Sequence, residues 1–262
     1  MSRTPSLYLP RPSGVHQLHP LTKLAFALTA LVTAIALPDL PSLLAVYAFT
    51  LLPLSIWGRV IGPFTRSSLR AVAPFLLSLI VIQGFFTPGS YVLLQLGPFA
   101  FTAEGLASAL TFAARIWIGL SSALLLMLTT RLDALMLALT QRGLSPQISY
   151  IVVTALQLIP HFQVRAQTIL DAQRSRGLDT EGGLRRRFRA LQSLVLPLLL
   201  SSLLDTDKRA LALEARGFRR PGPRTSWMSL RDSVLQRGLR WLCAAAALAL
   251  LAGRLARALA ER

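Results

Sequence analysis

The chain has 262 residues, of which 53% are hydrophobic and only 15% are charged, and its formal net charge is +17. A soluble protein usually carries about 25% charged residues, so this composition favours a multi-span membrane protein. Nucleic-acid binding would also suit the positive charge. The arginines, however, lie between long apolar runs and not among aromatic residues on a soluble domain, which argues against that partner.

Four apolar runs follow one another in the first half of the chain. They cover residues 24–37, 40–57, 71–86 and 105–128. Each approaches the roughly 20 residues that cross a bilayer as a helix, and Lys23 could extend the short first run by snorkelling. We therefore predict a four-span membrane region within residues 1–130.

The charges of the connections between these runs alternate. Residues 1–23 and 58–70 contain no acidic residue, and their cations are Arg3, Arg11, Lys23, Arg59, Arg66 and Arg70. The connections 38–39 and 87–104 hold one acidic residue each and no Lys or Arg. Because Lys and Arg accumulate in cytoplasmic loops, we expect the N-terminus and the loop 58–70 in the cytoplasm and residues 87–104 outside.

Residues 131–237 differ in composition from the first half of the chain, since charged residues occur throughout. Two apolar stretches, 148–160 and 191–204, contain or end in proline and are short for a span. We predict long, partly membrane-buried helices that lead into amphipathic cytoplasmic ones. The run Arg185-Arg186-Arg187-Phe188-Arg189 predicts a cytoplasmic surface near anionic headgroups.

The last apolar run, 241–253, is just long enough to span with its flanks. The expected fold class is thus an all-α membrane protein with about five transmembrane helices and a cytoplasmic coupling domain of long amphipathic helices. Its expected divisions are residues 1–130, the coupling region 131–237 and a C-terminal membrane helix within 238–262.

Two related segments carry the most specific signal. Residues 172–178 read Ala-Gln-Arg-Ser-Arg-Gly-Leu, and residues 212–218, forty positions later, read Ala-Leu-Glu-Ala-Arg-Gly-Phe. Each predicts a helix that ends in Arg followed by Gly, because Gly readily takes the left-handed conformation that stops a helix. Arg in the last turn lies at the negative end of the helix dipole, and its planar fork suits a carboxylate. The simpler alternative is an arginine that caps the carbonyls of its own helix.

Arg115 lies near the middle of the fourth apolar run. An arginine facing lipid there would cost at least ~3 kcal/mol, so we expect it to face protein or water. A contact to a partner or to the coupling helices is one interpretation. A snorkelling arginine, or a span with shifted edges, is the other.

Signals of catalysis are missing from the sequence. Neither lysine, Lys23 or Lys208, follows a Gly-rich phosphate-binding loop, so we do not expect an ATPase. No catalytic set, metal site or cofactor site is expected, and the single cysteine, Cys243, is interpreted as a small packing residue.

With these segments, the chain resembles the transmembrane T component of energy-coupling factor transporters, the bacterial importers of vitamins and of cobalt or nickel. The resemblance covers most of the length, and the paired Arg-Gly segments are its specific part. One departure is Ser175, where the family pattern has Ala. The matching segments are His19-Pro20-Leu21-Thr22-Lys23-Leu24, Thr102-Ala103-Glu104-Gly105-Leu106, Leu158-Ile159-Pro160, residues 172–179, Leu196-Pro197-Leu198 and residues 212–218.

The resemblance implies a subunit of the bacterial cytoplasmic membrane that links two ABC-type ATPase subunits to a substrate-binding membrane S component. Arg176 and Arg216 would each end a coupling helix that docks in an ATPase groove. The implied coupling residues are Ser175, Arg176, Gly177, Ala215, Arg216 and Gly217. The imported substrate would be a vitamin or a transition-metal ion, selected by the S component.

Two other classes stay open at this stage. The permease of a conventional ABC importer would form its own substrate path and usually docks through a single cytoplasmic loop. A membrane enzyme, such as a lipid-headgroup transferase, would need clustered Asp or His at the cytoplasmic face, whereas the acidic residues here are scattered.

Overall fold

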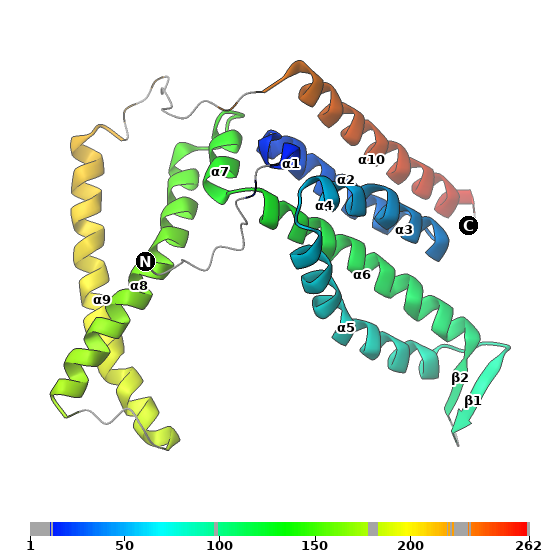
Figure 1. Cartoon of the computed structure of the whole chain (residues 1–262), viewed down its shortest axis with the longest axis horizontal. Helices are drawn as coiled ribbons and strands as arrows, with labels where there is room; N and C mark the ends of the chain where they lie inside the picture. Colours follow the sequence, from blue (N-terminus) through cyan, green and yellow to red (C-terminus); the bar gives the residue numbers. More distant parts are fainter. Residues whose placement is uncertain are drawn as a thin grey trace. The chain divides into compact units, whose positions relative to one another are not determined.

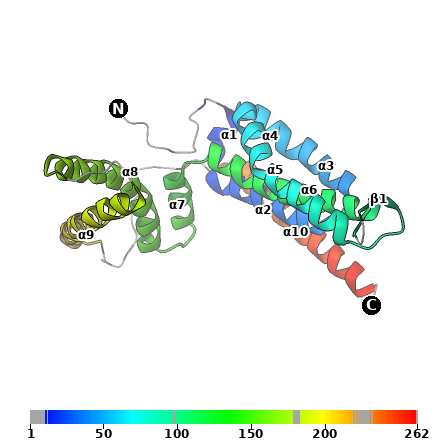
Figure 2. The ribbon, with the colours of Figure 1, turned by 90° about the horizontal axis from the view of Figure 1, so that it is seen from below.

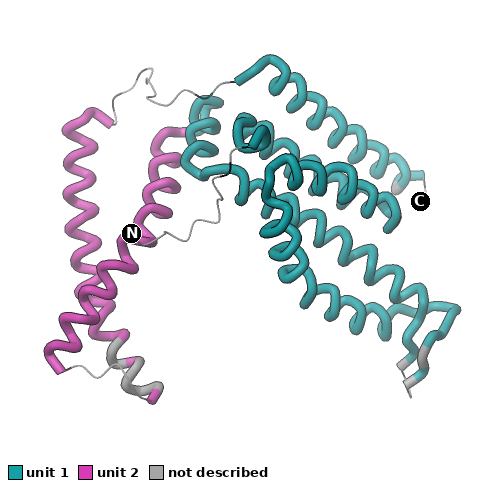
Figure 3. Tube along the Cα trace, viewed as in Figure 1, with its two compact units in different colours: residues 1–144, 230–262 teal, residues 145–229 magenta. Residues whose placement is uncertain are grey.

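The protein is described from a computed structural model, whose described residues are 11, 13–96, 99–177, 183–218, 220, 222, 230 and 232–260. The chain forms two compact units (Figure 3). Unit 1 comprises Met1–Leu144 and Leu230–Arg262, and unit 2 comprises Ser145–Ser229. The expected division of the chain by side of the membrane, at residues 130 and 237, stays a prediction.

Unit 1 is mainly helical (Figures 1 and 2). Its elements are α1 (Gly14–Gln17), α2 (Pro20–Ala36), α3 (Leu40–Val46), η1 (Tyr47–Leu51), α4 (Leu52–Trp57), α5 (Ile61–Phe86), β1 (Val92–Leu96), β2 (Phe99–Thr102), α6 (Ala103–Thr129), α7 (Leu132–Thr140) and α10 (Val234–Ala260). Helix α6 packs against both α2 and α5, and α10 packs against α2.

Four helical segments are long and apolar enough to cross a membrane: Leu40–Trp57, Ile61–Phe86, Ala103–Thr129 and Val234–Arg257, with Pro20–Ala36 as a shorter apolar helix. The segment Leu40–Trp57 is one continuous helix, in which the π-helical turn η1 joins α3 to α4. The expected all-α membrane fold is confirmed. The one departure among the described residues is the antiparallel hairpin of β1 and β2, within the predicted loop 87–104.

Two predicted boundaries are wrong. Residues 58–70 are not a loop, because α5 begins at Ile61. Its first turns are amphipathic: Phe64, Ser68 and Val72 recur every fourth residue and are buried, while Arg66 and Arg70 are exposed. Helix α10 likewise extends well beyond the predicted run 241–253 at both ends.

The core of unit 1 is built around the second span. Leu43, Val60 and Phe64 are fully buried, and the Tyr47 ring packs against the Trp117 ring of α6, tilted by 31° with 4.2 Å between centroids. Helix α6 presents small buried residues, Ala109, Ala113 and Ala114, to its neighbours. Small residues allow membrane helices to approach closely, which explains the tight packing around α6.

Lys23 does not snorkel, contrary to the expectation from sequence. Its side chain is 7% exposed, and its ammonium donates to the carbonyls of Thr129, at 2.8 Å, and His16, at 3.2 Å. Thr129 is the last residue of α6, where carbonyls lack partners within the helix. A cation is favourable at that end, so Lys23 fastens the start of α2 to the end of α6.

Unit 2 consists of two long helices, α8 (Pro146–Ser175) and α9 (Leu184–Ala215), which pack against each other and cross in Figure 1. They contain the two apolar stretches predicted as long helices, with Pro160 inside α8 and Pro197 inside α9. No described side chain of α8 is buried. The side chains of Arg185–Arg187 and Arg189 lie outside the described residues, so the proposed headgroup contact stays a prediction.

Candidate functional site at two helix ends

Helix α8 ends as its sequence predicts. Ser175 is its last residue, and Arg176 caps it with φ −90° and ψ 10°. Gly177 follows with φ +87°, and its N–H donates to the Arg174 carbonyl at 2.9 Å. The left-handed Gly therefore turns the chain out of the helix directly after Arg176. Leu178 and Asp179 of this segment lie outside the described residues.

Helix α9 ends in the same way. Ala215 is its last residue, Arg216 caps it with φ −84° and ψ 4°, and Gly217 has φ +67°. The N–H groups of Gly217 and Phe218 donate to the carbonyls of Glu214 and Leu213, both at 2.9 Å. This pair of bonds is the Schellman motif, which satisfies the last carbonyls of a helix through a left-handed Gly.

The two arginines are available for another molecule. Arg176 and Arg216 are both exposed, as are their neighbours Ser175 and Ala215. Among the described residues, no acidic side chain pairs with either guanidinium. The carbonyls of Ala212, Leu213 and Glu214 at the end of α9 accept from backbone N–H groups, so they do not need the Arg216 side chain as a cap. Each arginine is an exposed cation at the end of a long helix.

One ion pair joins α8 to α9 inside unit 2. The guanidinium of Arg165 binds the Asp205 carboxylate, and their side chains are 39% and 37% exposed. The bond from Arg165 holds the pKa of Asp205 below its ordinary value, although burial opposes this shift. A cleft of about 590 Å³ lies beside this pair, lined by residues of both helices that include Leu158, Phe162 and Pro197. The cleft and the ion pair together lie where α8 and α9 cross.

Arg115 contacts its own chain. Its Nη2 donates to the carbonyls of Leu37, at 3.1 Å, and Pro38, at 3.5 Å, and its guanidinium lies 5.2 Å from the Phe112 ring centroid. Leu37 caps the C-terminal end of α2, so a cation in the middle of α6 binds the negative end of a neighbouring helix. A contact of Arg115 to another subunit stays a prediction.

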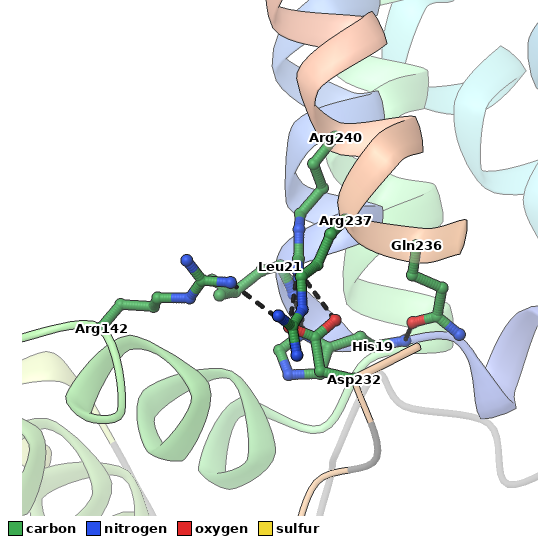
Figure 4. Close-up of polar contacts among 7 residues, drawn as sticks. All are labelled: His19, Leu21, Arg142, Asp232, Gln236, Arg237 and Arg240. Atoms are coloured by element: carbon green, nitrogen blue, oxygen red, sulfur yellow. Dashed lines mark hydrogen bonds and ion pairs between the residues drawn. The ribbon is translucent and has the colours of Figure 1, made fainter. Parts of the chain in front are cut away.

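A cluster that the sequence reasoning missed surrounds Asp232, just before α10 (Figure 4). Arg240 donates to both Asp232 oxygens, at 2.8 and 2.7 Å. Arg142 and Arg237 lie 3.3 and 3.4 Å from the same carboxylate. We call Asp232, these three arginines and His19 the Asp232 cluster. The available signal was that Asp232 is the single acidic residue between Glu214 and Glu261 in an arginine-rich stretch.

His19 joins the Asp232 cluster to α2. Its Nδ1 accepts from the N–H of Leu21, at 3.3 Å, and from Arg240, at 3.2 Å. The backbone N–H of His19 donates to Oε1 of Gln236 at 2.9 Å. Burial lowers the pKa of His19, Asp232 opposes this, and the charges of Arg240 and Arg142 lower the pKa further. A neutral ring with a lone pair on Nδ1 is therefore the form that this site stabilises.

The described residues contain no group of three or more His, Cys, Asp or Glu side chains that could hold a metal ion. The candidate site itself offers two exposed arginines. Two exposed guanidiniums, each at the end of a long helix, suit acidic or polar grooves on a partner.

Comparison with known proteins identifies close resemblances. The model of the CbiQ family, described as cobalt transport protein, matches residues 12–227, which include both helix ends. An energy-coupling factor transporter transmembrane protein EcfT of Streptococcus equi is 28% identical over 232 residues, covering 85% of this chain and 86% of the relative. An EcfT of Heliobacterium modesticaldum is 33% identical over 229 residues, covering 81% and 82%.

A third relative differs in size. A putative ABC transporter ATP-binding protein of Bifidobacterium longum is 28% identical over 236 residues, which are 84% of this chain but 29% of that protein.

Proposed function

Because this chain belongs to the CbiQ family of cobalt transport proteins and is an energy-coupling factor transporter transmembrane component, we propose that it docks two ABC-type ATPase subunits through Arg176 and Arg216. A transport role, and not an enzymatic one, follows from the family. The protein is a multi-pass membrane protein, as its apolar helices indicate.

The observation that carries the proposal is the pair of helix ends. Two long helices each finish in an exposed arginine followed by a left-handed glycine. Ser175 with Gly177, and Ala215 with Gly217, keep the contact surface around each guanidinium small. An arginine that enters a partly desolvated groove and meets a carboxylate forms a contact whose loss costs roughly 2–5 kcal/mol. Two such contacts would hold one ATPase subunit each.

The Bifidobacterium relative supports an ATPase partner. Its segment similar to this chain is a minor part of a longer protein whose name is that of an ABC transporter ATP-binding protein. A sequence of this type thus occurs in one polypeptide with such a protein. In the present chain the ATPases would be separate subunits.

The remaining partner is a substrate-binding membrane S component, which would select a vitamin or a transition-metal ion. The N-terminus and unit 2 would lie in the cytoplasm, in keeping with the Lys and Arg content of the connections. In this arrangement ATP-driven motion of the ATPases reaches the membrane unit through α8 and α9.

Affinity purification of the tagged chain from membranes tests the docking role. We expect Arg176→Glu and Arg216→Glu each to weaken recovery of the ATPases, and the double variant to abolish it while membrane insertion is unchanged. Lys208→Glu, the same charge change on the exposed surface of α9, is the matched control and should leave recovery at the parental level. Stoichiometric ATPase in the double variant would refute the docking role.

The same purification separates this proposal from a conventional ABC permease. An additional small membrane protein that co-purifies with the chain and binds the substrate supports the S-component arrangement. A complex of this chain with ATPases alone, active in import, would support the permease.

A further inference from the structure

The Asp232 cluster lies where the chain passes between its two units. The chain leaves unit 1 after Leu144 and returns to it at Leu230. Arg142 precedes the first passage by a few residues, and Asp232 follows the second. In Figure 4 their side chains face each other, and Arg142 Nη2 lies 3.3 Å from Asp232 Oδ2. An ion pair therefore fastens the outgoing and returning segments together.

The fastened segments are also tied to the membrane helices. Arg240 of α10 binds Asp232 through its Nη2 atom, and the two side chains are only 13% and 19% exposed. Arg240 in turn donates to His19, which caps the start of α2. The two connections, α10 and α2 thus meet at one carboxylate.

One negative charge holds this arrangement against several positive ones. Among the described residues, Asp232 is the only acid in contact with Arg142, Arg237 and Arg240. Without it, three guanidiniums would face one another, and Arg240 would be largely buried without a counter-charge. Removing one partner of such a pair is far more costly than the pair is worth on its own.

We propose that Asp232 is a positioning residue that clamps the outgoing and returning connections of unit 2 to α2 and α10. The clamp holds the unit 1 ends of both connections at α2 and α10, so that force arriving through either connection acts on these two helices. The inference rests on the proposed function for its role in transport, but the clamp itself is a property of the isolated chain.

Arg142 and Arg237 form a matched pair for testing the clamp. They approach the same Asp232 oxygen at 3.3 and 3.4 Å, and their side chains are 56% and 58% exposed. Arg142 lies on the outgoing connection, whereas Arg237 lies on α10 itself. A merely structural charge cluster predicts similar effects of Arg142→Gln and Arg237→Gln, and the clamp predicts an effect of Arg142→Gln alone.

The first measurement uses the isolated full-length chain. Spin labels are placed on Gln141→Cys and Leu235→Cys, both at exposed positions, in a Cys243→Ala background. Pulsed electron spin resonance should give one narrow distance distribution in the parent and in Arg237→Gln. The distribution should broaden in Arg142→Gln and most in Asp232→Asn. An unchanged distribution in Arg142→Gln, or equal broadening in Arg237→Gln, would overturn the clamp.

The second measurement uses the complex with its ATPases, with radioactive Co²⁺ as the uptake probe. Co²⁺ taken up per ATP hydrolysed should fall about two- to fivefold in Arg142→Gln, the range expected for a partly exposed ion pair, and recover in Arg142→Lys. It should fall more than about tenfold in Asp232→Asn, where the largely buried Arg240 loses its partner. The same amount of Co²⁺ taken up per ATP hydrolysed in Arg142→Gln as in the parent would contradict the clamp. A parental chain without ATPases or Co²⁺ uptake would instead count against the proposed partners or substrate, and the spin-label distances would still decide the clamp.

Discussion

Arg165 on α8 and Asp205 on α9 join the two helices of unit 2, and each lies eleven residues before the arginine that ends its helix. From this ion pair to either end, the helical rise of 1.5 Å per residue gives about 16 Å. The two arms that carry Arg176 and Arg216 are therefore equally long. Equal arms suit a subunit that presents one contact to each of two similar ATPases.

Breaking this pair should disturb the crossing without unfolding the chain. Both side chains are more than a third exposed, so the loss of stability should be small. We expect Asp205→Asn to lower uptake about two- to fivefold, and the exchange Arg165→Asp with Asp205→Arg to restore part of it. Asp207→Asn removes an exposed acid two residues away and should have no effect. Equal losses in Asp207→Asn and Asp205→Asn would show that the pair does not set the crossing.

The glycines after the two arginines should resist substitution because of backbone conformation and not because of space. Gly217 has φ +67°, and a Cβ added there would meet its nearest neighbour at 3.9 Å. Because a left-handed residue with a Cβ costs roughly 1–2 kcal/mol, Gly217→Ala should destabilise and Gly217→Val should be worse. Gly217→Asn should be tolerated better.

Gly238 in α10 is the control for this prediction, since it is helical and also has open space around it. Gly238→Ala should stabilise the protein by up to about 1 kcal/mol, whereas Gly217→Ala should destabilise it. Thermal unfolding of the purified chain measures both effects. Equal stability of Gly217→Val and the parent would mean that the left-handed turn is not required.

Most of the fold could be predicted because it depends on local pattern. Apolar runs and the charges between them identified the five apolar helices of unit 1, and the Arg-Gly pairs identified both ends in unit 2. The start of α5 was missed because Arg66 and Arg70 suggested a loop, although Phe64, Ser68 and Val72 already had helical spacing.

What could not be predicted depends on contacts between distant parts of the chain. Arg240 and His19 are 221 positions apart, and Lys23 and Thr129 are 106 apart. Periodicity and motif spacing describe one element at a time, so they do not reveal that Lys23 binds the end of α6 instead of reaching for the membrane surface.

Arg115 should stabilise the chain by binding the end of α2. That helix has 17 residues, about 25 Å at 1.5 Å per residue, which is less than the roughly 30 Å of a bilayer core. Arg115 and Arg254 each donate to carbonyls near its C-terminal end. Arg115→Leu should cost about 1.5–3 kcal/mol, as for a lost bond from a charged donor, and Arg115→Lys less.

Thermal unfolding of the isolated chain, together with complex yield, distinguishes a bond of Arg115 within the chain from a contact to another subunit. A lower unfolding temperature of the isolated Arg115→Leu chain supports the bond within the chain. An unchanged unfolding temperature with a lower yield of the complex supports a subunit contact. Full stability, yield and uptake in Arg115→Leu would exclude both.

The hairpin of β1 and β2 should face the outside. Ser90 is exposed and lies in the connection without Lys or Arg, whereas Gly62, also exposed, lies beside the cationic start of α5. In a Cys243→Ala background, a membrane-impermeant maleimide should label Ser90→Cys from outside and Gly62→Cys only after the membrane is opened. The reverse pattern would invert the proposed orientation.

Acidification should weaken the Asp232 cluster in two separate steps. In the folded protein the pKa of His19 lies below its ordinary value of 6.5, mainly through burial, with Asp232 opposing and Arg240 and Arg142 contributing. As the pH falls below about 6.5, His19 is protonated in the unfolded chain before it is protonated in the folded chain. The free energy of unfolding therefore decreases until the pH reaches the pKa of His19 in the folded chain. Burial raises the pKa of Asp232, but the hydrogen bond from Arg240 and the charges of Arg240, His19 and Arg237 together outweigh it, so this pKa is also lowered. Its stabilisation is complete above its ordinary carboxyl pKa, about 3.9, and is lost as the pH falls through its lower folded value.

His19→Asn separates the first step from the second. Asn can also accept a hydrogen bond at the start of a helix but does not titrate, so unfolding midpoints should become independent of pH between about 5 and 7. His161→Asn changes a histidine of α8, in unit 2 and outside the Asp232 cluster as defined above, and is the matched control. If His19→Asn and the parent lose stability equally on acidification to pH 5, a different group is responsible and His19 does not sense pH in this site.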